Sequence, residues 1–287
     1  MIIGRKKAGT VMMNSVRDLR LIALDLDGTL TNDEKEITPA TKQVLMDCQR
    51  SGVRLALISA RPAPGLFLDR DRLLLPRFHG ILASYNGGCI ADASTGEVLS
   101  RTSMDTEQTR LLLKQLKNLD VTVILDDGNQ FYVTDRNGYK VDYECRNNRM
   151  SCTEVKDLAA FLDFAPVKLL LSARPEVLPE VRSKTDRLLP KGLITVQTAP
   201  FYFEIIPSSI NKGRALTQIC RILSVDPART MAFGDSENDI PMLQAAGFGV
   251  AMGNAAESVK TAADFITASN NDDGIAKAIL EACSISR

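Results

Sequence analysis

The stretch LIALDLDGTLTND, from Leu21 to Asp33, sets the pattern that the rest of the sequence follows. It begins as an apolar run and stops at two carboxylates, Asp25 and Asp27, which a Gly-Thr pair follows at once. Such a run is typical of a buried strand, and Gly28 favours a tight turn directly after it. Burying unpaired carboxylates is costly. The stretch therefore predicts a buried strand over 19–25 whose terminal acids face a cation or a substrate.

The next segment reads as a helix followed by a second strand. Thr38 is a candidate N-cap, Pro39 suits the first helical position, and Gly52 lies past the expected end. The run VRLALIS, residues 53–59, is nearly continuously apolar, as in a parallel strand that is covered on both faces. Strand, helix and strand in this order open a right-handed βαβ unit. We therefore expect an α/β core with a doubly wound, mostly parallel, Rossmann-like sheet.

The pattern changes after residue 85 and returns near residue 208. A Gly-centred hairpin at 89–101, a helix at 106–119 and several short strands follow one another, which favours an α+β module. A helix over 211–225 and a strand over 230–235 then resume the parallel pattern. We expect an N-terminal extension at 1–18 that is a candidate for disorder, a core built from 19–85 and 208–287, and an inserted α+β cap domain at 86–207.

Composition and charge exclude several classes of function. The 287 residues contain 35 Lys and Arg and 35 Asp and Glu, and this zero net charge argues against nucleic-acid and membrane-surface partners. No apolar stretch reaches the ~20 residues of a membrane helix, and the first 18 residues do not read as a signal peptide. The six cysteines are scattered, which disfavours a zinc or redox motif. We expect a cytoplasmic protein with reduced thiols, and the oligomeric state stays open.

Four stretches share one place in the expected topology, the carboxyl end of a strand or the start of the next helix. In an open α/β sheet this edge forms the binding crevice. The four stretches are the Asp25 and Asp27 pair, Ser59, Lys212 and GDSENDIPML at 234–243.

His79 is the only histidine, so a Ser-His-Asp triad or a histidine-based zinc site has little support.

The acids of these stretches indicate a metal site. Asp25, Asp27, Asp235 and Asp239 would be hard to keep ionised side by side without a cation. Oxygen ligands without His or Cys suit a hard ion, and Mg²⁺ binds one or two carboxylates together with a substrate phosphate. Lys212 in the same crevice fits a phosphate. We therefore expect a Mg²⁺ site next to a phosphate site.

Further groups complete the expected phosphate site. The hydroxyl of Ser59 and the turn amides near it can hold a phosphate oxygen, and Asn238 lies at a helix start, where anions are favoured. A carboxylate can act as the nucleophile of phosphoryl transfer, which needs mostly positioning and charge neutralisation. A second Asp two residues on can protonate the leaving oxygen and then deprotonate water.

Each feature alone also has an ordinary structural explanation. An Asp-Gly pair is a common turn, a Lys at a helix start is usually solvated, and a Ser at a strand end is usually a cap. The sequence Ser-Ala-Arg-Pro at 59–62 recurs at 172–175, inside the expected insert. The repeat could indicate a duplicated phosphate site, but we interpret the second copy as coincidence. The aromatic residues of the insert are interpreted as packing rather than as a substrate shelf; they are Phe131, Tyr132, Phe201, Tyr202 and Phe203.

Taken in order, these motifs resemble those of the haloacid dehalogenase (HAD) superfamily. The pattern D-x-D-G-T-L matches 25–30, a strand-end Ser matches Ser59, a helix-opening Lys matches Lys212, and G-D-x-x-N-D-x-x-M-L matches 234–243. YNGG at 85–88, AMGNAAESVK at 251–260, AADFIT at 262–267 and NNDDGIAKAI at 270–279 are similar to the Cof-like (type IIB) branch, which carries a large α/β cap. The resemblance covers nearly the whole chain after the first ~18 residues.

The resemblance implies a Mg²⁺-dependent phosphatase, a phosphoric monoester hydrolase with an aspartyl-phosphate intermediate. Asp25 would be the nucleophile and Asp27 the acid and base. The phosphate would be held by Ser59, Lys212, Asn238 and the backbone amides of Leu26 and Ala60. Mg²⁺ would be bound by Asp25, the main-chain carbonyl of Asp27, and Asp235, and Asp239 would orient these ligands.

The implied substrate is a small phosphorylated metabolite, with sugar phosphates as the first choice. Relatives commonly carry Gly where this chain has Ala60, which would be strained if that turn needs a positive φ. Two other functions stay open. One is a phosphomannomutase-like phosphotransferase, which needs a bisphosphate activator, and the other is a non-catalytic regulator that binds a phosphometabolite, against which the intact Asp25 and Asp27 pair argues.

Overall fold

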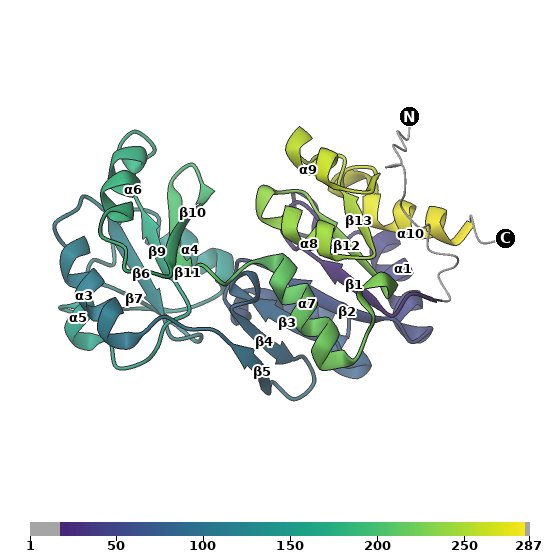
Figure 1. Ribbon diagram of the computed structural model, residues 1–287, viewed down its shortest axis with the longest axis horizontal. Coiled ribbons are helices and arrows are strands. Elements are labelled where there is room, and N and C mark those ends of the chain that lie inside the picture. The colour runs from purple at the N-terminus through teal and green to yellow at the C-terminus, as the bar shows by residue number, and fades with distance from the viewer. Residues whose placement is uncertain (1–17, 285–287) are drawn as a thin grey trace. The chain divides into compact units, whose positions relative to one another are not determined.

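The computed structural model describes residues 18–284 in two compact units (Figure 1). The first unit contains the described residues up to Ala60, then Leu66–Ser100, and then the chain from Asn211 onward. The second unit contains Arg61–Gly65 and Arg101–Ile210. Except for Asp18, the N-terminal extension expected at 1–18 lies outside the described residues.

The first unit is built on an eight-stranded sheet in the order β14-β13-β12-β1-β2-β3-β4-β5. The strands from β14 to β3 run parallel to one another, and β4 joins β3 in the antiparallel sense. The bounds of the strands are β1 (Leu21–Leu24), β2 (Arg54–Ile58), β3 (Ile81–Ser84), β4 (Cys89–Asp92), β5 (Val98–Arg101), β12 (Thr230–Gly234), β13 (Phe248–Ala251) and β14 (Phe265–Ile266).

Helices cover both faces of this sheet, as expected of a doubly wound fold. The first one begins as the sequence predicts, because Thr38 is its N-cap, accepts a hydrogen bond from the amide of Thr41, and precedes Pro39. The helices of this unit are α1 (Pro39–Arg50), α2 (Phe67–Arg72), α7 (Lys212–Leu223), α8 (Ile240–Ala245), α9 (Glu257–Ala262) and α10 (Gly274–Ser284).

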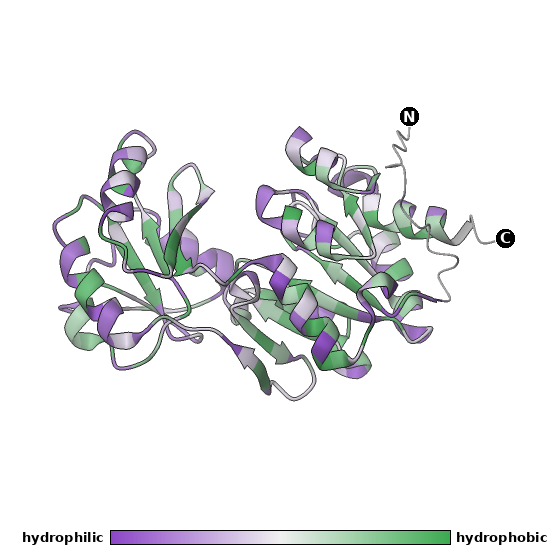
Figure 2. Cartoon of the chain, in the orientation of Figure 1, coloured by the Kyte–Doolittle hydropathy of each residue, from purple (hydrophilic) through white to green (hydrophobic). Residues whose placement is uncertain are grey.

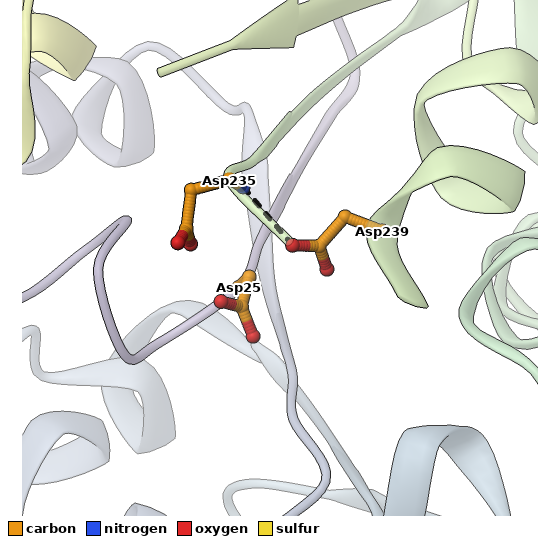
Figure 3. Close-up of side chains that lie close together, drawn as sticks. All are labelled: Asp25, Asp235 and Asp239. Atoms are coloured by element: carbon orange, nitrogen blue, oxygen red, sulfur yellow. Dashed lines mark hydrogen bonds between the residues drawn. The ribbon is translucent and has the colours of Figure 1, made fainter. Parts of the chain in front are cut away.

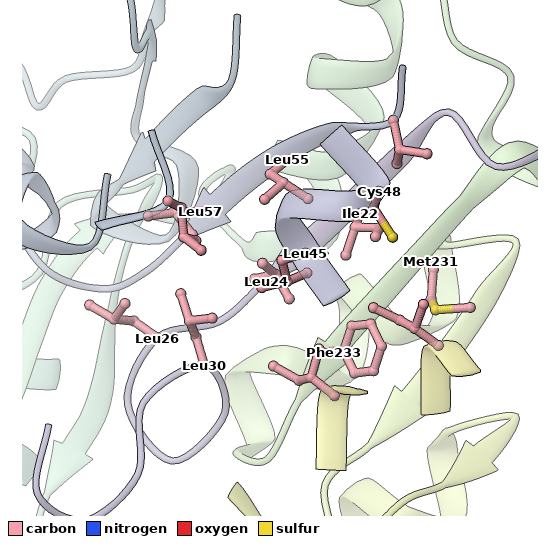
Figure 4. Close-up of a cluster of buried hydrophobic side chains, with 14 of the residues drawn as sticks. Ile22, Leu24, Leu26, Leu30, Leu45, Cys48, Leu55, Leu57, Met231 and Phe233 are labelled. Carbon is pink, nitrogen blue, oxygen red and sulfur yellow. The ribbon is translucent and has the colours of Figure 1, made fainter. Parts of the chain in front are cut away.

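The central strand β1 buries side chains on both faces, which explains why its sequence is a continuous apolar run. Ile22 and Leu24 join a core cluster with Leu45 of α1 (Figure 4). Leu21 and Ala23 alternate with them and join a second cluster on the opposite face. The first cluster also contains residues of α10, and the second contains residues of α7, α8 and α9.

The hairpin expected at the start of the insert lies in the sheet of the first unit instead. β4 pairs with β3 from Ile81 opposite Asp92 to Ser84 opposite Cys89, and β5 is the next strand outward. The inserted unit therefore begins at Arg101 rather than at residue 86, and ends at Ile210 rather than at residue 207. The boundary lies later than expected because the connection after β3 is short. The chain turns back there and adds β4 and β5 to the sheet before it enters the second unit.

The second unit is an α+β module around a six-stranded sheet in the order β10-β11-β9-β6-β7-β8. The elements of the second unit are α3 (Thr106–Leu116), β6 (Thr122–Asp126), β7 (Phe131–Val133), α4 (Val141–Asn148), β8 (Cys152–Glu154), α5 (Leu158–Phe161), β9 (Leu169–Ser172), α6 (Leu178–Asp186), β10 (Leu193–Ala199) and β11 (Tyr202–Pro207).

In both units the strands are mostly hydrophobic, while the helices carry many hydrophilic residues (Figure 2).

The aromatic residues that the sequence analysis interprets as packing lie in or against the core of the second unit. Phe131 and Phe203 are fully buried, and Tyr132 and Tyr202 are nearly so. The second Ser-Ala-Arg-Pro copy also has a structural role, because Ser172 at the end of β9 is buried and donates a hydrogen bond to the carbonyl of Tyr139. Neither observation gives this unit a second phosphate site of the kind that the repeat could have indicated.

Other expectations from composition can be compared with the described residues. No helix between residues 18 and 284 is long and apolar enough to cross a membrane. His79 is exposed and caps a short 3₁₀ turn with a left-handed backbone, as its position near a turn predicts. Five cysteines whose side chains are described are free thiols; they are Cys48, Cys89, Cys145, Cys152 and Cys220.

We expect Leu55→Ala to lower the free energy of unfolding of the protein by about 2–5 kcal/mol, because Leu55 of β2 is fully buried in the first core cluster. Denaturant unfolding followed by circular dichroism measures the change. The matched control is Leu280→Ala on α10, where the leucine is 54% exposed and the expected loss is below about 1 kcal/mol. Equal losses in the two variants would contradict this description of the core.

Candidate active site

Two parallel neighbours in the sheet bring the first pair of acids together. β1 and β12 are in register, with Leu24 opposite Phe233, and the amide of Asp25 donates to the carbonyl of Phe233 at 3.1 Å. Asp25 follows β1 and Asp235 follows β12, so both stand at the carboxyl edge of the sheet. This is the edge at which the sequence predicts the binding crevice.

Three carboxylates gather at this edge (Figure 3). Each of Asp25, Asp235 and Asp239 offers one oxygen, and these oxygens all lie within 4.8 Å of one another. Asp25 and Asp239 are buried, and Asp235 is half-buried. Asp239 closes the 3₁₀ turn Glu237–Asp239, so the carboxylates come from the ends of two strands and from the turn before α8. Such a set would repel itself strongly without a positive charge.

Lys212 supplies one positive charge from the start of α7. Its ammonium donates to Asp25 Oδ1 at 2.5 Å and to Asp239 Oδ1 at 2.6 Å, and the residue is only 1% exposed. The helix starts here because the side chain of Asn211 caps it by accepting from the amide of Arg214. A lysine at a helix start is usually solvated, and this one is a buried partner of two acids instead.

Gly28 and Gly234 allow the backbone to approach the carboxylates closely. Gly28 has a φ of +80°, and a Cβ on it would lie 2.6 Å from Oδ2 of Asp235. A Cβ on Gly234 would lie 2.4 Å from the Cβ of Asp239. Any side chain at either position would therefore displace an acid of the cluster, which gives a physical reason for both glycines of the two motifs.

Hydrogen bonds fix the remaining orientations. Asp239 Oδ2 accepts from the amides of Asp235 and Ser236 at 3.0 and 2.9 Å. The hydroxyl of Thr29 donates to Asp235 Oδ1 at 2.7 Å. Asp239 thus holds the backbone of the loop that carries Asp235, and Thr29 adds a contact to the Asp235 carboxylate that the sequence did not indicate.

The strand-end serine lies in the neighbouring loop. Ser59 directly follows β2, is 2% exposed, and its amide donates to the carbonyl of Ala83 at 3.0 Å. Ala60 is not among the residues with positive φ in the described chain, so its side chain causes no strain at this turn. Leu26 is buried in the first core cluster, between Asp25 and Asp27 of the opening motif.

Asn86 is a residue of the site region that sequence reasoning missed. Its amide donates to the carbonyl of Ser59 at 2.7 Å, and its side-chain oxygen accepts from Asn238 Nδ2 at 3.1 Å. It therefore joins the serine loop to the loop that follows β12. The sequence signal that could have pointed to Asn86 was the YNGG stretch at 85–88. Within it, Gly87 has a φ of +92°, and a Cβ on it would lie 2.2 Å from the Cβ of Ala215.

Comparison with known proteins agrees with this geometry. A family model described as haloacid dehalogenase-like hydrolase matches residues 22–279. The chain belongs to this family. It is 32% identical over 263 residues to YxeH of Bacillus subtilis, covering 91% of this chain and 97% of that protein.

A second relative and a solved structure support the assignment. The 5-amino-6-(5-phospho-D-ribitylamino)uracil phosphatase YcsE of Bacillus subtilis is 29% identical over 269 residues, which cover 91% of this chain and 95% of that protein. A crystal structure of a haloacid dehalogenase-like hydrolase from Bacteroides thetaiotaomicron superposes with a TM-score of 0.86 at 32% identity, covering 92% of this chain and 99% of that one. The family expected from the motifs is thus confirmed, and the chain is a haloacid dehalogenase-like hydrolase.

The carboxylate of Asp27 lies apart from the three-acid cluster of the hydrolase. Sequence analysis placed Asp27 among four neighbouring acids, but the cluster found among residues 18–284 contains only Asp25, Asp235 and Asp239. The carboxylate of Asp27 instead pairs with the ammonium of Lys35 at 2.7 Å. Its side chain is 38% exposed, so it stands at a wetter place than the other acids.

The three-acid cluster fits a divalent metal ion. Its donors are carboxylate oxygens only, and hard cations such as Mg²⁺ prefer such donors. Lys212 alone leaves the cluster with an excess of negative charge when all three acids are ionised. A divalent ion held by Asp25 and Asp235 would compensate that excess.

Burial dominates the protonation of the cluster. Burial raises the pKa of Asp25 well above its usual value, the Asp239 carboxylate raises it further, and Lys212 opposes both. Burial also raises the pKa of Asp235, against the hydrogen bond from Thr29. Burial would lower the pKa of Lys212, but the carboxylates of Asp239 and Asp25 outweigh it, so the ammonium stays charged.

We expect Asp25→Asn to stabilise the metal-free protein at pH 8. Because the pKa of Asp25 is raised in the folded state, its ionisation costs stability as the pH rises above the unfolded value of 3.8. The variant should therefore be more stable than the wild type at pH 8, and the gain should vanish toward pH 4. Urea unfolding in chelator at both pH values measures this. A variant less stable than the wild type at pH 8 would contradict it.

Proposed function

We propose that this hydrolase is a Mg²⁺-dependent phosphatase of small phosphorylated metabolites, with sugar phosphates as the preferred substrates. The observation that carries the proposal is the buried carboxylate of Asp25, one oxygen of which accepts a hydrogen bond from Lys212. This carboxylate lies at the C-terminal end of β1, close to Asp235 and Asp239. A carboxylate fixed in this way is positioned as a nucleophile, and the lysine offers charge to a phosphoryl group.

The reaction proceeds in two steps. In the first, a carboxylate oxygen of Asp25 forms a bond to phosphorus as the P–O bond of the ester breaks, and Asp27 gives its proton to the leaving alkoxide. In the second, Asp27 takes a proton from water, whose oxygen attacks phosphorus and releases Asp25 with inorganic phosphate. The phosphate oxygens are held by Lys212, Ser59 and Asn238, together with the amides of Leu26 and Ala60.

Asp25, Asp235 and the main-chain carbonyl of Asp27 would hold Mg²⁺, and Asp239 orients the Asp235 loop through the two amides it accepts from. When bound, the ion neutralises charge on the phosphoryl oxygens and on the carboxylates. In the proposal the inserted unit, residues 101–210, acts as the cap that selects the leaving group and excludes water.

We expect Asp25→Asn to lower phosphate release by about 10³-fold or more, because the amide is no nucleophile. The assay measures inorganic phosphate released in Mg²⁺ from a panel of sugar phosphates, pyridoxal phosphate and flavin mononucleotide. Asp47→Asn is the control, since Asp47 lies on the exposed face of α1 and pairs with Arg50. Unchanged turnover in Asp25→Asn would remove the proposed mechanism.

The same panel separates the phosphatase from its rivals. A mutase should release little phosphate and should isomerise substrate only after a bisphosphate activator is added. A regulator should bind the ester without turnover. Phosphate release by the wild type without a bisphosphate is the result expected from the proposal.

We expect a chelator to abolish activity and Mg²⁺ to restore it. In Asp235→Asn the Mg²⁺ concentration for half-maximal activity should rise about tenfold or more, since one ligand has lost its charge. Titration of activity with Mg²⁺ measures this, and thermal unfolding checks that the variant is folded. Full activity after exhaustive chelation, or an unchanged Mg²⁺ requirement in Asp235→Asn, would argue against a metal held here.

A further inference from the structure

An ion pair joins the carboxylate of Asp27 to the ammonium of Lys35. The ammonium of Lys35 donates to Asp27 Oδ1 at 2.7 Å, and the two side chains are 38% and 58% exposed for Asp27 and Lys35 respectively. Pairs exposed to this degree contribute little to stability, because water screens them and the side chains lose freedom. The pair therefore contributes little to the folding stability, and it involves the residue proposed to move protons in the reaction.

The backbone of Lys35 is held in a conformation that lysine does not favour. Its φ is +61°, in the left-handed region where Gly and Asn are the usual residues. The turn around it is closed by its own bonds. The amide of Asn32 donates to the Glu36 carbonyl at 2.9 Å, the amide of Lys35 donates to the Asn32 carbonyl at 3.0 Å, and the amide of Glu36 donates to Asn32 Oδ1 at 2.9 Å.

The turn is also anchored on the side of α2. Arg72 Nη1 donates to the carbonyl of Lys35 at 3.0 Å. The same guanidinium donates to Asp69 at 3.1 Å, and Asp69 is itself buried at 5% exposure. The carbonyl of Lys35 is therefore tied to a side chain that a buried acid holds in place.

The loop before α10 anchors the other side of the turn. Asn270 Nδ2 donates to the Thr31 carbonyl at 3.0 Å. Asn271 Nδ2 donates to Asp33 Oδ2 at 3.0 Å, and Asn271 Oδ1 accepts from the amide of Asp33 at 3.1 Å. The backbone on both sides of Lys35 is therefore fixed, so the lysine side chain extends toward Asp27 from a defined position.

We propose that Lys35 is the positioning residue of Asp27 in proton transfer, an inference that rests on the proposed function. By holding Oδ1, the ammonium sets the rotation of the carboxyl group, so that Oδ2 faces the ester oxygen. In the first step the proton on Oδ2 passes to the leaving alkoxide as the P–O bond breaks, and in the second step Oδ2 takes a proton from the attacking water. Lys35 itself touches neither substrate nor phosphate.

If Lys35 acts through Asp27, its loss should affect some substrates more than others. An alkoxide, such as the leaving group of a sugar phosphate, needs a proton as it departs, so its departure depends on how Asp27 is positioned. p-Nitrophenolate is a stable anion and departs without a proton. A residue that acts only through Asp27 therefore matters for alkyl phosphates and not for p-nitrophenyl phosphate.

The experiment compares kcat/KM for p-nitrophenyl phosphate with that for the sugar phosphate that the wild type hydrolyses fastest. The ratio kcat/KM reports events up to the first P–O cleavage, so it isolates the acid step. Lys35→Gly removes the ammonium and accepts the positive φ at no steric cost. We expect about a tenfold loss with the sugar phosphate and less than a twofold change with p-nitrophenyl phosphate, a part of the 10²–10⁴-fold that general acid catalysis contributes.

Two further variants sharpen the comparison. Lys35→Arg keeps a cationic donor and should recover most of the lost activity. Lys42→Ala removes an exposed lysine of α1 and should change neither value. Thermal unfolding shows whether each variant is folded. Equal losses for the two substrates in Lys35→Gly, or no loss at all, would overturn the inference.

The variant Asp27→Asn keeps the inference and the proposed function distinguishable. If it loses the sugar phosphate activity selectively while Lys35→Gly behaves as the wild type, the inference fails and the proposed function stands. If Asp27→Asn shows no selective loss, or if the wild type hydrolyses neither substrate, the proposed function fails first.

Discussion

The buried ammonium of Lys212, bound to Asp25 and Asp239, is the interaction on which the site depends. It joins three elements that are far apart in the sequence, the end of β1, the turn before α8 and the start of α7. A buried ion pair is costly to desolvate and contributes most through the geometry that it imposes. Asp239 also accepts hydrogen bonds from the backbone amides of Asp235 and Ser236. Lys212 therefore contacts two acids of the cluster directly and is linked to the third, Asp235, through Asp239.

The sequence predicted the position of the site because strand ends are visible in it. Asp25, Ser59 and Asp235 each end an apolar run, and parallel strands bring their carboxyl ends to one edge. The direction of the Asp27 side chain could not be predicted in this way. Asp27 follows the same strand two residues later, but its carboxylate is fixed by Lys35, whose position depends on contacts with α2 and with the loop before α10.

Boundaries were less visible than motifs for a similar reason. The hairpin at 89–101 has the composition of an α+β module, and only its pairing with β3 shows that it belongs to the sheet of the first unit. Arg61–Gly65 groups with the second unit although Ser59 and Ala60 group with the first. One bond that accounts for this runs from Arg61 to the carbonyl of Asn147 at 2.7 Å, a contact between residues too distant in the chain for local patterns to reveal.

The central place of β1 has a consequence for how the enzyme loses its function. The strand is hydrogen-bonded to β12 on one side and β2 on the other, so its amides exchange with solvent only when the whole sheet opens, whereas β14 and β5 at the margins can fray. Since Asp25, the proposed nucleophile, directly follows this strand, fluctuations at the margins leave its carboxylate in place. Residual turnover during gradual denaturation would therefore track the cooperative collapse of the first unit rather than its local breathing.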